Sequence, residues 1–137
     1  MPLLGNDTDG AVTRKRIEAF AAKTEKVTVV AATDAATVQA QATLAAAGHV
    51  VYTMTPSTGR TLTTPTGAEL GAAFTDEAVG TSFKFSVVNL AGATHAVTLT
   101  AGASGVTLVG VAAVAAASSA SFVGVFTAAN TVIIYRV

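Results

Sequence analysis

The sequence predicts a mainly β protein whose C-terminal part, residues 61–137, forms a barrel or sandwich of short strands. Turn-forming residues recur roughly every ten residues after residue 78, which is the spacing of strands in such folds. Between the turns, apolar and polar residues alternate, as they do on a strand with one buried face. The alternating segments lie at residues 83–87, 97–100, 106–108, 122–126 and 132–136.

Charge is nearly absent from this part of the chain. From Ala78 to the C-terminus the charged side chains are Lys84 and Arg136, and charged residues make up 12% of the whole chain, about half of the usual share. The segments at 122–126 and 132–136 are apolar on both faces, which is typical of strands that are covered on both sides. In a barrel, one face of each of these strands is covered by the barrel interior. We therefore expect copies of the same chain, arranged around a symmetry axis, to cover the other.

The first 60 residues are predicted to form an N-terminal arm and a small α/β region. The pattern predicts helices over residues 13–26 and 35–47, the second capped by Thr33-Asp34 and ended by Gly48, and strands at 27–30 and 49–54. The threonine-rich segment 55–65 contains two prolines and reads as an extended connector. We place a domain boundary there, which divides the chain into residues 1–60 and 61–137. Thr66 and Glu69 then have the spacing of a capping box that starts a short helix.

Composition argues against several classes of protein. The chain has no cysteine, so it forms no disulfide framework and no thiolate metal site. Its formal net charge is zero, which gives no overall attraction to nucleic acid. The most apolar run, residues 106–117, is shorter than the roughly 20 residues of a membrane-spanning helix. We therefore expect neither a nucleic acid nor a membrane as a partner, and the N-terminus lacks the pattern of a signal peptide.

No catalytic signature emerges, and we expect a protein that is not an enzyme and needs no cofactor or metal. His49 and His95 are isolated in sequence. Asp76 and Glu77 are adjacent, and neighbouring side chains of an extended segment point apart rather than across a substrate. A small hydrolase that uses Asp76, Glu77 or His95 remains an alternative.

Five segments carry a resemblance to a known family. They are Gly80-Thr-Ser-Phe-Lys-Phe-Ser-Val-Val-Asn89, residues 94–102, residues 105–110, Ser121-Phe-Val-Gly-Val-Phe-Thr127 and Val132-Ile-Ile-Tyr-Arg-Val137. Together they resemble the β-rich domain of capsid decoration (cement) proteins of tailed bacteriophages, and residues 62–74 are similar to the start of that domain. The resemblance covers residues 61–137. It implies a homotrimer on the outer capsid surface of the virion, which bridges capsomers of the major capsid protein and holds the shell through N-terminal segments.

These observations lead to one hypothesis with an alternative. The hypothesis is a capsid decoration protein with a jelly-roll-like C-terminal barrel. Because the basic stretch near residue 15 lacks interleaved aromatic residues, it fits an acidic protein surface better than nucleic acid. The expected capsid contacts are Arg14, Lys15, Arg16 and Phe20. The expected trimer-packing residues, some of which must instead fill the barrel interior, are Phe83, Phe85, Phe122, Phe126, Ile134 and Tyr135. The alternative is a phage fibre or head-fibre module that binds a host surface receptor, because related modules also occur in fibres.

Overall fold

The computed structural model describes residues 26–75 and 77–137. The predicted helix over residues 13–26 lies outside the described residues, apart from Lys26. Also outside them are the four expected capsid contacts, Arg14, Lys15, Arg16 and Phe20. Asp76 also lies outside them.

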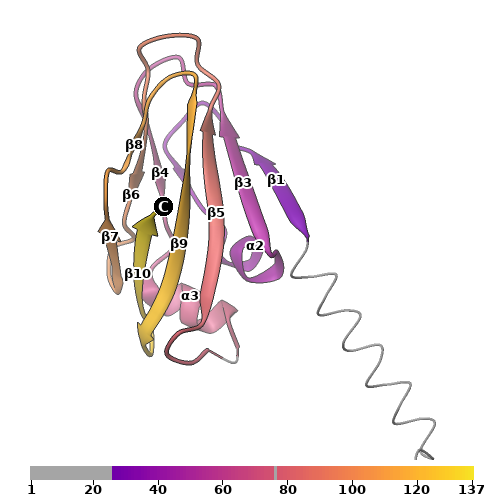
Figure 1. The fold of residues 1–137 in the computed structure, drawn as a ribbon, viewed down its shortest axis with the longest axis vertical. Coiled ribbons are helices and arrows are strands. Elements are labelled where there is room, and N and C mark those ends of the chain that lie inside the picture. The colour runs from indigo at the N-terminus through magenta and orange to yellow at the C-terminus, as the bar shows by residue number, and fades with distance from the viewer. Residues whose placement is uncertain (1–25, 76) are drawn as a thin grey trace, which may run out of the picture.

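The described residues form a mainly β structure with two short helices (Figure 1). The elements are β1 (Val27–Ala31), β2 (Thr37–Val38), α2 (Gln41–Ala46), β3 (His49–Met54), β4 (Arg60–Thr63), α3 (Gly67–Ala73), β5 (Ser82–Asn89), β6 (Val97–Thr100), β7 (Val106–Val109), β8 (Ala113–Val114), β9 (Ser118–Ala128) and β10 (Thr131–Arg136). The prediction of a mainly β protein is confirmed. The strand predictions from residue 82 onwards are correct to within a few residues, except that β8 was not predicted.

The strands belong to two sheets that are not closed into a barrel. The larger sheet has the order β1-β3-β5-β9-β10-β7, and the smaller has the order β2-β4-β6-β8. In Figure 1 the larger sheet lies in front of the smaller one. Each sheet keeps two edge strands, so of the two predicted arrangements, a barrel or a sandwich, the barrel was wrong.

The chain alternates between the two sheets as it runs from β1 to β6. Thr28 of β1, Val50 of β3 and Phe85 of β5 are neighbours in the larger sheet, and all three strands are parallel. In the smaller sheet β2, β4 and β6 are parallel in the same way. Parallel neighbours need a crossover connection, and here each crossover runs through the other sheet. This arrangement differs from the expected jelly-roll-like topology, because a jelly roll is built from antiparallel Greek keys.

The predicted boundary near residue 60 does not separate two units among the described residues. In the larger sheet β3 pairs with β5, and in the smaller sheet β2 pairs with β4, so both sheets contain strands from both sides of the boundary. The segment predicted as a connector contains β4, which lies between β2 and β6. The helix predicted over residues 35–47 is reduced to α2, because Thr37–Val38 pairs with β4 instead.

One hydrophobic core is shared by both sheets and both helices. Leu44 and Leu70 come from the helices, and Leu62 and Leu99 from the smaller sheet. The larger sheet contributes an aromatic cluster in which the rings of Phe85 and Phe122 stack with their centroids 5.2 Å apart. The remaining aromatic members are Tyr52, Phe74, Phe83 and Phe126. The core therefore lies on the inner face of the larger sheet and leaves the opposite face uncovered by the described residues.

Candidate functional site: the outer face of the larger sheet

The structure places the six expected trimer-packing residues on two different faces. The side chains of five are at most 4% exposed in the single chain; they are Phe83, Phe85, Phe122, Phe126 and Ile134. Side chains buried to this degree fill the protomer's own interior and are not available to a neighbouring chain. Tyr135 is 40% exposed and points to the other side of β10. Among the six, Tyr135 is therefore the residue that fits an intersubunit contact.

Tyr135 belongs to an apolar patch on the outer face of the larger sheet. In the strand register, Tyr135 lies between Val109 of β7 and Val123 of β9. One row along, Ile133 of β10 is paired with Val125 of β9. Val109 is 46% exposed, and the other three side chains are half-buried. We call these five residues the outer patch: Val109, Val123, Val125, Ile133 and Tyr135.

The outer face carries very little charge. The charged residues in the strands of the larger sheet are Lys84 and Arg136. The Nη1 atom of Arg136 donates to the carbonyl oxygens of Val111 and Ala113, both at 2.9 Å, so this guanidinium is turned toward the segment between β7 and β8. Lys84 is exposed next to Val123 in the register. It is therefore the one charged side chain of this sheet that is not engaged by the described residues.

A hydrogen-bonded polar row crosses the middle of the same face. The Nε2 atom of His49 lies 2.8 Å from the Oγ of Ser86, and this Oγ lies 2.9 Å from the Oγ of Ser121. The three residues stand on β3, β5 and β9, so the row links three neighbouring strands. An imidazole beside a hydroxyl is also part of an activated-serine site, which further needs a group that orients the base and donors for an oxyanion. Sequence reasoning missed this row because its members are 35 and 37 residues apart.

Glu77 and His95, the two described residues of the alternative hydrolase site, are not brought together. Glu77 lies before β5, and its Oε1 accepts from the backbone N–H of Asn130 at 3.4 Å. His95 lies after β5, where its carbonyl oxygen accepts from Asn89. The eight residues of β5 lie between them and span roughly 25 Å. Within the described residues no group of three or more His, Cys, Asp or Glu side chains could hold a metal ion.

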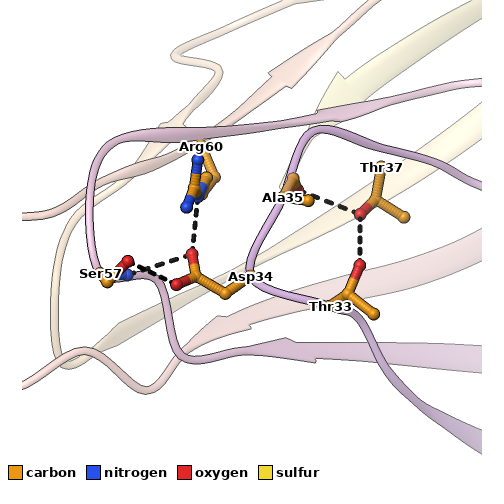
Figure 2. Close-up of polar contacts among 6 residues, drawn as sticks. All are labelled: Thr33, Asp34, Ala35, Thr37, Ser57 and Arg60. Atoms are coloured by element: carbon orange, nitrogen blue, oxygen red, sulfur yellow. Dashed lines mark hydrogen bonds and ion pairs between the residues drawn. The ribbon is translucent and has the colours of Figure 1, made fainter.

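Asp34 joins two loops at one end of the molecule rather than capping a helix. Its Oδ1 accepts from the Nε of Arg60 at 2.6 Å and from the backbone N–H of Ser57 at 3.1 Å, and the Ser57 hydroxyl donates to Oδ2 (Figure 2). These bonds, the one from Arg60 foremost, hold the pKa of Asp34 well below its usual range. The loop between β1 and β2 is thereby fastened to the loop between β3 and β4, and the predicted N-cap role of Asp34 was wrong.

A shallow depression of about 390 Å³ lies where β5 ends and β9 begins. It is lined by Val88, Asn89, Leu90, Ala117, Ser118 and Ser119. The Asn89 side chain is already engaged there, since it donates to the carbonyl oxygens of His95 and Val114 at 2.7 and 2.9 Å. The Ser118 hydroxyl donates to the carbonyl oxygen of Ala115 at 2.7 Å, so the depression offers mainly the Ser119 hydroxyl and the exposed Leu90 side chain to a ligand.

None of the helices in the described part of the chain is long and apolar enough to cross a membrane. Comparison of the chain with protein-family models, with curated proteins and with solved structures finds no match.

Proposed function

We propose that this chain is a non-enzymatic virion structural protein that decorates and stabilises the outer capsid surface as a homotrimer bridging capsomers. The observation that carries the proposal is the outer face of the larger sheet, where the apolar outer patch is partly exposed and Lys84 is the one charged side chain of the sheet that the described residues leave unengaged. The resemblance of residues 61–137 to phage decoration proteins supports the same function.

The absence of charge from the outer patch favours contact between copies of the same chain. Around a symmetry axis each residue meets copies of itself or of close neighbours, so charged side chains there would repel one another. The outer patch avoids this cost because none of its five residues is charged. Burial of its apolar area would add about 25 cal/mol for each Å² that is removed from water.

The fold is consistent with a rigid domain that contacts the capsid through several separate segments of a trimer. Two sheets around one core support a β-sandwich as the architecture, and strands from before residue 60 are part of it. The segment with Arg14, Lys15, Arg16 and Phe20 precedes β1 directly and is proposed to contact the major capsid protein. Three such contacts on one trimer bind far more tightly than one, because the second and third are intramolecular.

The test combines the mass of the purified protein in solution with its copy number in purified particles. We expect a trimer in solution and many copies on each shell. Tyr135→Asp should shift the trimer to a monomer with an unchanged circular dichroism spectrum. The matched control is Val38→Asp, which charges another exposed strand residue, on the smaller sheet. A wild-type protein that is monomeric at every concentration and absent from particles would contradict the proposal.

A receptor-binding fibre or head-fibre module is the second candidate, favoured by the depression next to Ser118 and Ser119. Such a module would be present in few copies per particle and would bind a host surface glycan. Leu90→Glu in this depression should weaken attachment to cells if this second function is correct. It should leave shell binding unchanged if the chain is a decoration protein.

A further inference from the structure

The two edges of the larger sheet are open among the described residues. β1 and β7 stand at the ends of the strand order, and each is paired on one side. An unpaired edge is a template for another strand, and proteins usually protect it with charged residues, proline or a bulge. Neither strand contains a charge or a proline. The register irregularity among the described pairs of this sheet lies at Thr131/Val132 of β10, and not in either edge strand.

The unpaired backbone groups can be assigned to particular residues. Ala32 N–H donates to Thr53 and the Lys26 carbonyl accepts from His49, so even-numbered residues of this segment face β3. Because successive residues face opposite sides, Val27, Val29 and Ala31 present their N–H and C=O groups to the free side. On the other edge the Gly105 carbonyl accepts from the N–H of Val132, so odd-numbered residues of β7 face β10. Val106 and Leu108 therefore present their N–H and C=O groups to the free side.

The core also reaches both edges. Val30 on β1 packs against the core while remaining half-buried, and so do Val106 and Leu108 on β7. On the outer face, Val29 is 65% exposed at one edge and Val109 is 46% exposed at the other. A strand added at either edge would cover these side chains and satisfy the free backbone groups together.

The strand directions allow the two edges to pair with each other. β1, β3 and β5 are parallel, β9 is antiparallel to β5, β10 is antiparallel to β9, and β7 is parallel to β10. β1 and β7 therefore run in the same direction. A rotation about an axis along the strands keeps this direction, so β7 of one copy can join β1 of the next as a parallel pair. Such a head-to-tail contact, repeated, closes into a ring when the rotation from copy to copy divides a full turn, and otherwise continues as an open filament.

We propose that copies of this chain join edge to edge, with the free side of β7 paired in parallel with the free side of β1 of the next copy. The smaller sheet and both helices occupy the inner side of the larger sheet, so the ring closes with the outer faces toward its axis. The outer patch then lines the inside of the ring, with Lys84 next to it. The number of copies, three, rests on the proposed function.

The sharpest test is a proline at the free edge of β1. Val29→Pro removes an N–H that faces away from β3 and leaves the bonds to β3 intact. Val38→Pro is a matched control: it also removes a free-side N–H, since Gln39 N–H is the one bonded to Thr63, and Val38 is likewise 65% exposed. We expect Val29→Pro to lower the association constant by about tenfold or more, measured by sedimentation, and Val38→Pro to leave it unchanged.

Hydrogen exchange of the full-length protein provides the second measurement. The amides of Val29 and Leu108 should gain protection together as protein concentration rises. Protection of Val29 alone, at every concentration, would show that residues 1–25 cover β1 and would overturn the proposal. If Val29→Pro fails to fold, Val29→Lys tests the same edge. Unchanged assembly of the folded variant would refute the edge contact but leave the proposed trimer standing, whereas a monomeric wild-type protein would refute both.

Discussion

Replacement of Gly124 by alanine should destabilise the protein, because the new methyl group would clash with the Phe83 ring. Gly124 of β9 is directly opposite Phe83 of β5 in the register, and the Phe83 ring lies over it. A Cβ at position 124 would stand 2.5 and 2.7 Å from two atoms of that ring and closer still to a third. The ring has little room to move, because its centroid is 5.4 Å from that of Phe74 and 6.3 Å from that of Phe85.

The expected magnitude is a balance of two effects. Overpacking of a core side chain costs about 1–3 kcal/mol. Alanine also loses less backbone entropy on folding than glycine, which returns about 0.4–1 kcal/mol. Because the contact involves several ring atoms held on two sides, we expect the upper part of the first range. The free energy of unfolding should therefore fall by about 2 kcal/mol.

Denaturant unfolding followed by circular dichroism measures this change. Gly92→Ala is the control, since nothing lies within 4 Å of a Cβ built at Gly92, and its effect should stay within about 0.5 kcal/mol. In a Phe83→Leu background the ring is gone, so Gly124→Ala should cost less than half of its original value there. Equal costs in both backgrounds would refute the assignment of the strain to the Phe83 ring.

Three further substitutions test other contacts. Asp34→Asn removes a carboxylate whose pKa is lowered in the folded state, mainly by the hydrogen bond from Arg60. The stabilisation from that carboxylate is complete above its unfolded pKa of about 4 and is lost as the pH falls below it, so the wild-type advantage in unfolding midpoint should shrink between about pH 5 and pH 2. Thr66→Ala removes the capping box with Glu69 at the start of α3 and should cost about 1 kcal/mol in urea unfolding. Asn89→Leu removes an amide that donates to the buried carbonyl of Val114 and accepts from the buried N–H of Ala91, and should cost about 2–3 kcal/mol by the same measurement.

The strands and their inner faces could be predicted from the sequence because they depend on local alternation. Phe83, Phe85 and Val87 share one face of β5, and all three are buried. The capping box at Thr66 and Glu69 is local as well, and it is present as predicted. The parallel pairing of β1, β3 and β5 could not be predicted, since the register between strands depends on residues far apart in the chain.

The error in residues 35–47 has a tertiary cause. Alanine and glutamine favour a helix locally, but the backbone of residues 37–39 is taken up by the edge of β4, where Gln39 N–H donates to Thr63. The side chain of Asp34, which could have capped the helix, is instead bound by Arg60 and Ser57. Helix propensity is a weak preference that such contacts override.

Because β9 and β10 are apolar on both faces, their sequence pattern left open which face is internal. Gly124 helps to decide between the two faces. Phe122, Gly124 and Phe126 share a face of β9. A glycine between two aromatic residues in a strand marks close approach by another group, and here that group is the Phe83 ring, which reaches across from β5 on the same face. The glycine and the ring must therefore both face the core. Tyr135, Val123 and Val125 then face outward, so these residues, rather than the phenylalanines, are available for the proposed contact with another copy.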